Sequence, residues 1–171
     1  MCSVAVSNDA ECIFNKEDYS GPHHNEQLGR FVDEALSFID SHSLKLDAVA
    51  VSCGPGSYTG LRIGTSMAKG ICYGRDVKLI AIPTLELLAV PVLLKEQAEE
   101  ENALLVPMLD ARRMEVYAQV FNRSLDEVRK IQADVVTAET YKEYLDKGPV
   151  YFFGNGAAKC MEEINHPNAH L

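Results

Sequence analysis

The chain has 171 residues, of which 47% are hydrophobic, and its formal net charge at pH 7 is −9. This length allows one large domain or two small ones, with enough apolar residues to bury a core. The acidic balance argues against a protein that holds nucleic acid by itself, because that binding comes largely from Lys and Arg side chains. No apolar run approaches the roughly 18 residues of a membrane-spanning helix, and no secretory signal pattern is visible, so we expect a cytoplasmic protein.

The first part of the chain is predicted to alternate strands and helices. Residues 2–7 and 11–16 are short apolar runs on either side of a turn, which is typical of a β-hairpin. Residues 25–44 are predicted to form a helix, and residues 47–53, DAVAVSC, a buried strand. The helix has its apolar side chains at helical spacing, and these are Leu28, Phe31, Val32, Ala35, Leu36 and Ile39.

A second helix is predicted over residues 60–74, followed by a strand over 77–82. Thr84 is expected to cap a third helix, which Pro91 should interrupt because proline lacks the N–H that a helix interior needs. This alternation of strands and helices indicates an α/β layer. The charged run KEQAEEEN then marks a boundary near residue 100, which predicts a first domain over 1–100 and a second over 101–171.

The second domain is predicted to begin with two strands, over residues 103–111 and 114–121, around the charged turn DARR. Residues 137–147 carry a capping-type start and are predicted to be a helix. Residues 150–160, VYFFGNGAAKC, have the pattern of a strand, a second glycine turn and a helix start. Three interpretations of the charged turn stay open: an interdomain ion network, a partner surface or a charged hairpin tip.

The stretch VSCGPGSYTGLRIG, residues 51–64, has the order strand, glycine-rich turn, helix, which often holds phosphates. A Walker loop has a lysine where LRIG stands, and a dinucleotide fingerprint has its third glycine one residue before Gly60. A nucleophile elbow has glycines where Pro55 and Thr59 stand. All three patterns fail on spacing, although a nucleotide site that uses Ser57 and Thr59 remains an open alternative.

The helix predicted over 60–74 is apolar around most of its circumference. The stripe expected to cover the sheet comprises Leu61, Thr65, Ala68 and Cys72. A nearly opposite stripe comprises Ile63, Met67, Gly70 and Gly74, with Gly64 and Ile71 between the two. The remaining polar stripe comprises Arg62, Ser66, Lys69 and Tyr73. The second apolar stripe needs a cover of its own, either the helix over 25–44 or another protein. Helix glycines cost about 1 kcal/mol each relative to alanine, so their presence suggests a close helix–helix approach.

No metal or catalytic site is expected. His166 and His170 form an HxxxH pair, but such a pair converges on a metal only in a helix, and Pro167 opposes a helix there. Five scattered cysteines without a CxxC pair are expected to be reduced thiols. Cys53 ends a buried strand, and no base that would orient it as a nucleophile can be identified.

Three segments, GPGSYTGLRIG, DARRMEVY and FGNGA, closely resemble the bacterial TsaB family, also called YeaZ, in sequence and in spacing. The residues that carry the resemblance are Gly54, Pro55, Gly56, Ser57, Thr59, Gly60, Arg62, Gly64, Asp110, Arg112 and Glu115. The resemblance implies the two-domain α/β fold of the actin, hexokinase and Hsp70 superfamily, built from ribonuclease-H-like halves with mixed sheets and flanking helices.

The resemblance also implies a function. Members of the family are non-catalytic subunits of the complex that makes threonylcarbamoyladenosine on tRNA, and they bind and activate the catalytic paralogue TsaD. The ATPase TsaE joins through the complex, tRNA is contacted only through it, a homodimer forms when the subunit is alone, and no cofactor is expected. The expected interface residues are Leu28, Phe31, Val32, Ile63, Met67, Gly70 and Ile71. The alternatives are a glycoprotease-like peptidase or a nucleotide-binding enzyme of the same superfamily.

The chain departs from the family pattern in three respects. Family members usually have a strand before CSVAVS, and without it we expect the first sheet to lack an edge partner. Met114 stands where the family usually has glycine, which puts the turn geometry there in doubt. Closing elements of the second domain are also expected to be missing.

Overall fold

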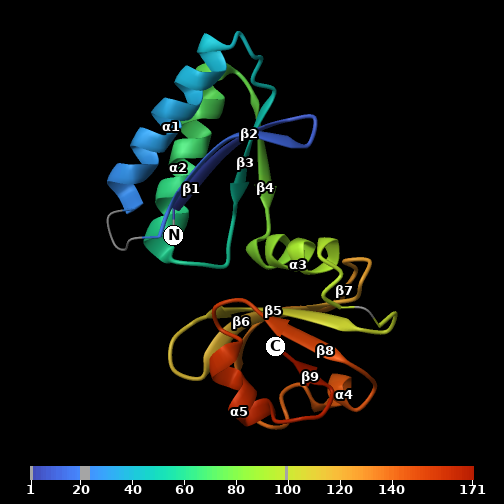
Figure 1. Ribbon diagram of the computed structural model, residues 1–171. Coiled ribbons are helices and arrows are strands. Elements are labelled where there is room, and N and C mark those ends of the chain that lie inside the picture. The colour runs from blue at the N-terminus through green and yellow to red at the C-terminus, as the bar shows by residue number, and fades with distance from the viewer. Residues whose placement is uncertain (1, 20–23, 99) are drawn as a thin grey trace. The chain divides into compact units, whose positions relative to one another are not determined.

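The computed structural model in Figure 1 describes residues 2–19, 24–98 and 100–171. The chain forms two compact units, Met1–Cys53 with Ser57–Ala81, and Gly54–Gly56 with Ile82–Leu171. The division therefore falls at residues 81–82 and not near residue 100. The cause is helix α3, which packs on the second unit: Leu85 and Ala89 are fully buried in one cluster with Leu105 and Phe121.

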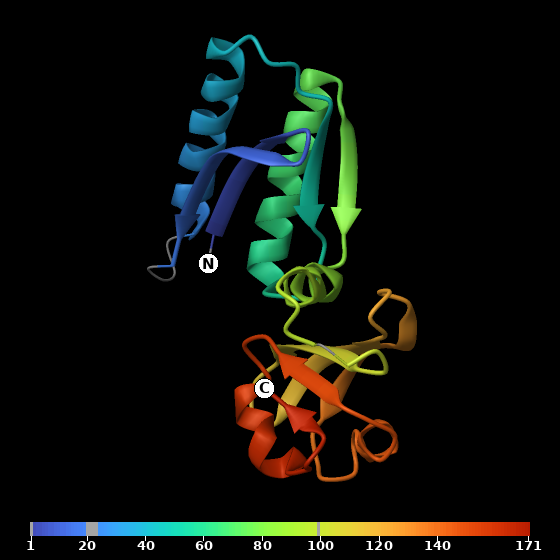
Figure 2. The same cartoon turned by 45° about the vertical axis from the view of Figure 1, so that its right-hand side comes forward.

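The first unit contains two two-stranded sheets and two long helices that lie side by side (Figures 1 and 2). Its elements are β1 (Cys2–Asn8), β2 (Glu11–Asp18), α1 (His24–Ser41), β3 (Ala48–Ser52), α2 (Tyr58–Arg75) and β4 (Lys78–Ile82). Strands β1 and β2 form the predicted antiparallel hairpin, and β3 pairs with β4. The core side of α1 is the i, i+4, i+8 stripe of Phe31, Ala35 and Ile39, each 4% exposed.

The second unit is built on a five-stranded mixed sheet in the order β7-β6-β5-β8-β9. Its elements are α3 (Thr84–Leu94), β5 (Leu104–Asp110), β6 (Glu115–Phe121), β7 (Glu127–Val135), α4 (Lys142–Leu145), β8 (Val150–Phe153), a 3-10 turn (Ala158–Cys160), α5 (Met161–Ile164) and β9 (Ala169–His170). Strands β5, β6 and β7 are antiparallel neighbours, while β8 runs parallel to β5 and β9. This is the predicted ribonuclease-H-like arrangement. The helix predicted over 137–147 is shortened to the single turn of α4.

The two units repeat one succession of elements: hairpin, helix, strand, helix, strand. In the second unit the central strand β5 joins the hairpin β6–β7 to β8. Among the described residues of the first unit no strand joins β1 to β3, so the two sheets remain separate.

Helix α3 differs from the prediction at both ends. Pro83 is the N-cap and Thr84 is already helical, while Pro91 lies inside the helix, which continues to Leu94. The last turn persists because Val92 and Leu93 pack against the buried cluster of the second unit. At the C-terminus of α3 the Lys95 N–H donates to the carbonyl oxygen of Pro91.

Candidate functional site

The glycine turn that follows β3 is tied down by its own hydrogen bonds. Gly54 has a φ of 108°, a conformation that favours glycine. Its N–H donates to the Thr84 Oγ1 at 3.1 Å, and the Thr84 N–H donates to the Gly54 carbonyl oxygen at 2.9 Å. The Gly54 N–H is therefore occupied within the chain and is not offered to a phosphate.

Ser57 is the N-cap of α2. Its side-chain oxygen accepts a hydrogen bond from the Gly60 N–H at 3.4 Å, and its carbonyl oxygen accepts one from the Leu61 N–H at 2.9 Å. Serine is a preferred N-cap because its hydroxyl satisfies one of the free N–H groups at a helix start. The structure thus separates the two residues named for a nucleotide site, since Ser57 caps the helix while Thr59 lines the groove described next.

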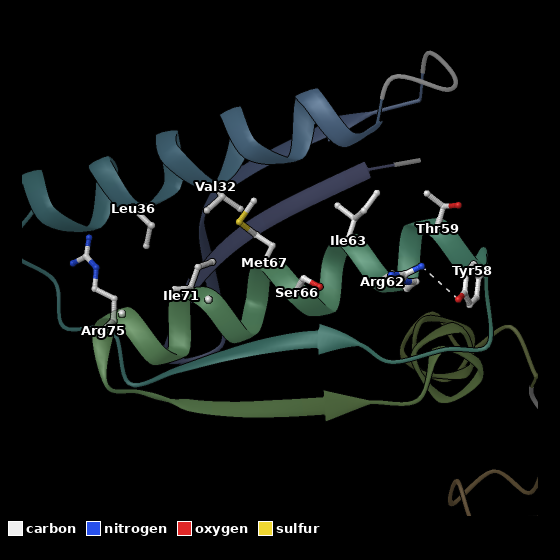
Figure 3. Close-up of a pocket in the computed structure, with 12 residues that line it drawn as sticks. Val32, Leu36, Tyr58, Thr59, Arg62, Ile63, Ser66, Met67, Ile71 and Arg75 are labelled. Carbon is white, nitrogen blue, oxygen red and sulfur yellow. Dashed lines mark hydrogen bonds between the residues drawn. The ribbon is translucent and has the colours of Figure 1, made fainter.

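An open groove of about 920 Å³ lies along α1 and α2. Figure 3 shows Val32 and Leu36 on α1 facing Met67 and Ile63 on α2. Among the described residues, the groove is lined by Val32, Leu36, Tyr58, Thr59, Arg62, Ile63, Ser66, Met67, Gly70, Ile71, Gly74 and Arg75. The floor is apolar and the two ends carry polar side chains, which is the layout of a protein-binding surface.

The groove brings together most of the interface residues expected from the sequence. Five of the seven line it, and these are Val32, Ile63, Met67, Gly70 and Ile71. Leu28 is half-buried and lies outside the lining. Phe31 does not face the groove: it is 4% exposed and belongs to the core side of α1. Leu36 was missed, although its position four residues after Val32 could have placed it on the same face.

The stripes expected on α2 face opposite surroundings. On the sheet side Ala68 is 5% and Cys72 8% exposed. On the other side α1 leaves the groove open, and a Cβ built at Gly70 or Gly74 meets nothing within 4 Å. No described residue of the chain therefore makes the close approach that these glycines permit.

Polar contacts define the two ends of the groove. At one end Arg75 donates two hydrogen bonds to Asp40 of α1, each 2.7 Å long, and this holds the pKa of the Asp40 carboxyl below its ordinary value. At the other end the Arg62 guanidinium lies 5.4 Å from the centre of the Tyr58 ring (Figure 3). The groove is thus bounded by an ion pair and by a cation–π contact.

The second and third sequence motifs meet at the side chain of Lys159, which the sequence analysis did not single out. Its Nζ donates to the Asp110 Oδ1 at 2.5 Å and to the carbonyl oxygens of Arg113 and Glu115 at 2.6 and 2.9 Å. The Lys159 ammonium lowers the pKa of Asp110. Asp110 also accepts a hydrogen bond from the Arg112 N–H at 2.9 Å.

This arrangement makes the DARR turn a charged hairpin tip held within the second unit. The third motif, FGNGA, stabilises this turn through Asn155, whose side-chain oxygen accepts a hydrogen bond from the Asp110 N–H at 3.0 Å. A Cβ on Gly154, whose φ is 97°, would overlap the Met108 carbonyl oxygen. Arg112 and Arg113 both have positive φ, so a turn of this shape forms although Met114 stands where the family usually has glycine.

The two histidines of the HxxxH pair contact separate partners. The Asn168 N–H donates to the His166 Nδ1 at 3.1 Å, while the His170 ring stacks on Tyr151 at 4.8 Å between centres. The stretch between them is not helical, as predicted. Within residues 2–19, 24–98 and 100–171, no three His, Cys, Asp or Glu side chains gather as metal ligands would.

No helix in the same ranges is long and apolar enough to cross a membrane.

Comparison with known proteins matches residues 18–160 to the family model described as TsaD, tRNA N6-adenosine threonylcarbamoyltransferase. A Bacillus subtilis protein described as tRNA threonylcarbamoyladenosine biosynthesis protein TsaB is 31% identical over 94% of this chain and 69% of its own length. TsaB proteins of Haemophilus influenzae and Escherichia coli are 35% and 31% identical over 68% and 71% of this chain. A Limosilactobacillus reuteri tRNA N6-adenosine threonylcarbamoyltransferase matches only 35% of the chain, at 40% identity. The chain belongs to the TsaB (YeaZ) family.

Solved TsaB-family structures share the fold. One is described as an uncharacterised Pseudomonas aeruginosa protein with similarity to peptidase YEAZ. It has a TM-score of 0.76 at 19% identity and covers 99% of this chain and 76% of the other. YeaZ from Pseudomonas aeruginosa has a TM-score of 0.73 at 20% identity, and the match covers 99% of this chain and 78% of YeaZ. The predicted actin, hexokinase and Hsp70-like fold class is confirmed. The chain spans about half the length of the Haemophilus and Escherichia TsaB proteins, with 47% and 51% covered.

Proposed function

We propose that this TsaB-family protein takes part in the synthesis of threonylcarbamoyladenosine on tRNA, as a non-catalytic subunit that binds and activates TsaD. The observation that supports the proposal is the apolar groove between α1 and α2, which the chain leaves open. A neighbouring helix pair would pack its side chains between Met67 and Val32 and over Gly70, as ridges fit into grooves. This open groove, together with the similarity to TsaB proteins, supports TsaD as the protein that binds there.

The chemistry of the groove supports binding without catalysis. Its lining offers hydroxyls from Tyr58, Thr59 and Ser66 and guanidinium groups from Arg62 and Arg75, but, among the side chains that the structure describes, no carboxylate, histidine or cysteine. A hydroxyl nucleophile needs an adjacent base to activate it, and the lining contains none of the usual bases. The subunit would then act by holding the helices of TsaD in their active arrangement.

The wider assembly follows from the same surface. A second copy of this chain presents the same two helices, so the subunit alone would form a homodimer through the groove. TsaE would join through the complex with TsaD, and tRNA would bind stably only to that complex. We further infer that the protein works in the cytoplasm, where tRNA is modified.

Two alternative functions remain from the same superfamily. A glycoprotease-like peptidase is suggested by one structural relative that is described as similar to a peptidase. A nucleotide-binding enzyme would have to use the glycine turn, although Gly54 and Ser57 are already engaged there by Thr84 and Gly60. The experiment below separates the nucleotide-binding alternative from a binding subunit.

The test is Met67→Glu, with Tyr73→Glu as a control of equal charge on the same helix. Met67 lines the groove, whereas Tyr73 is 93% exposed and lies outside it. Burying an uncompensated carboxylate at an interface costs several kcal/mol, hence orders of magnitude in affinity. We expect Met67→Glu to abolish self-association in sedimentation and the pull-down of TsaD, with little change in melting temperature, and Tyr73→Glu to preserve both associations.

Two outcomes would contradict the proposal. If association survives while Met67→Glu melts far below the wild type, Met67 faces the interior of the unit and the groove is not the interface. If ATP binds tightly and Ser57→Ala abolishes that binding, the glycine turn is a phosphate site and the nucleotide-binding alternative holds.

A further inference from the structure

Helix α2 carries a second exposed surface beside the groove, and the two surfaces share Tyr58 and Arg62. Tyr58, Arg62, Lys69 and Tyr73 fall within about 60° of each other around the helix axis, at about 100° per residue. From Tyr58 to Tyr73 this α2 stripe is about 22 Å long, at 1.5 Å per residue. Tyr58 and Arg62 stand at the rim of the groove, while Lys69 and Tyr73 lie outside it.

The α2 stripe is positively charged in an otherwise acidic protein. Helix α2 contains Arg62, Lys69 and Arg75 and no Asp or Glu, although the whole chain has a net charge of −9. Arg75 is held by Asp40. Among the ion pairs formed within the described ranges, none involves Arg62 or Lys69. Arg62 contacts the uncharged Tyr58 side chain, so its charge, like that of Lys69, is not neutralised by an ion pair and can attract an external anion.

The aromatic part of the stripe is unusually open to solvent. Tyr73 is 93% exposed and Tyr58 is 74% exposed, so neither ring is needed for the core. Flat aromatic rings beside Arg and Lys are the surface on which single-stranded nucleic acids bind, since bases stack on the rings and the cations neutralise the phosphates. Duplex bases are already stacked and hide their faces, so such a surface selects unpaired nucleotides.

We propose that the α2 stripe binds single-stranded RNA, as a direct contact to the unpaired loop of the tRNA on which the complex acts. The identity of that RNA rests on the proposed function; the binding chemistry rests on the stripe alone. With only two cations outside ion pairs on an acidic protein, binding by the full chain is weak, with a dissociation constant of about 10⁻⁴ M at physiological salt. The contact therefore adds to a stronger RNA site elsewhere in the complex.

The experiment measures binding of the full chain to a labelled RNA hairpin and to a blunt duplex of the same stem, between about 50 and 200 mM salt. The charge variant is Arg62→Gln with Lys69→Gln, and its matched control is Lys142→Gln with Lys147→Gln in the second unit. The stacking variant is Tyr73→Ala, and its control is Tyr19→Ala, a tyrosine that is 70% exposed.

We expect the hairpin to bind more tightly than the duplex. The charge variant should reduce the slope of log K against log salt by about 1.4, at about 0.7 per cation, and Tyr73→Ala should weaken binding at least about fivefold. The control variants should change neither quantity. Equal binding of hairpin and duplex, equal losses in variants and controls, or no detectable binding at about 50 mM salt would each overturn the proposal.

The result is independent of the test of the proposed function. Met67→Glu should keep wild-type RNA binding while it loses the protein partner, because Met67 lies in the groove and not on the stripe. If Tyr73→Ala leaves both RNA binding and partner binding unchanged, the stripe proposal fails and the proposed function stands. If RNA binding follows the stripe but TsaD does not bind, the proposed function fails and the stripe proposal stands.

Discussion

Arg75 on α2 and Asp40 on α1 form a bidentate ion pair, with both N–O distances at 2.7 Å. The two residues are 35 positions apart in the chain, and they join the last turn of each helix. Arg75 also lines the groove. The pair therefore fixes the spacing of the two helices at one end of the surface on which the proposed partner docks.

This ion pair predicts a pH dependence. Hydrogen bonds from Arg75 lower the pKa of Asp40 below its ordinary value of 3.8, so the pair stabilises the fold above that pH and loses its effect as the pH falls below it. The contribution is small, because both side chains are partly exposed. We expect Asp40→Asn to melt slightly below the wild type at neutral pH, and the difference to vanish as the pH falls through the lowered pKa of Asp40. A difference that persists in acid would show that the pair is not its cause.

The helix glycines predict a variant that separates folding from docking. Gly70 and Gly64 both have open space around a Cβ, but only Gly70 lines the groove. Replacing either glycine by leucine should stabilise α2 by about 0.5–1 kcal/mol, because glycine is a poor helix former. Gly70→Leu should also fill the groove and abolish partner binding, while Gly64→Leu should bind normally. Calorimetry and pull-down measure the two effects; equal partner binding by both variants would exclude docking over Gly70.

A buried network in the second unit predicts a loss of stability. Asp134 is 8% exposed and accepts hydrogen bonds from the Tyr141 hydroxyl at 2.6 Å and from Arg129 at 2.5 and 3.3 Å. Burial and the neighbouring Asp134 both raise the pKa of Tyr141, which stays neutral and donates its proton. Tyr141→Phe removes this donor and should lower the free energy of unfolding by about 1–3 kcal/mol.

Urea denaturation provides the measurement for Tyr141→Phe, with Tyr117→Phe on the more exposed part of β6 as the control. The control should change the free energy of unfolding by less than about 0.5 kcal/mol. Partner binding should be unchanged in both variants, because neither tyrosine lines the groove. An equal free energy of unfolding for the wild type and Tyr141→Phe would mean that the hydrogen bonds from Arg129 alone are enough for the buried Asp134 carboxylate.

Helical periodicity predicted the helices and the two apolar faces of α2, but not which side of α1 is buried. Helix α2 was expected over residues 60–74 and spans Tyr58–Arg75, and its two apolar stripes do face opposite surroundings. On α1 the same periodicity gives one broad apolar face. Phe31 faces the core and Val32 faces the groove. Which part of the apolar face is buried depends on where β1 packs against α1, and the spacing of apolar residues along the helix does not determine it.

Contacts between distant residues were the part that local patterns could not supply. Lys159 lies 49 residues from Asp110, and nothing in FGNGAAK signals that its ammonium caps the DARR turn. The domain boundary was misplaced for a similar reason: the charged run at 95–102 marks a surface segment, whereas the packing of Leu85 against Leu105 decides which unit α3 joins. Motif resemblance, by contrast, identified the fold and the family from three short segments.

The central claim, that the subunit activates TsaD through the α1–α2 groove, is tested most directly by reconstituted tRNA threonylcarbamoylation. The reaction would be run with TsaD and TsaE from the same organism and with wild-type chain, Met67→Glu, Gly64→Leu or no chain. We predict full modification with wild type and Gly64→Leu, and equally low modification with Met67→Glu and with no chain. Full modification in the absence of the chain, or with Met67→Glu, would contradict the account.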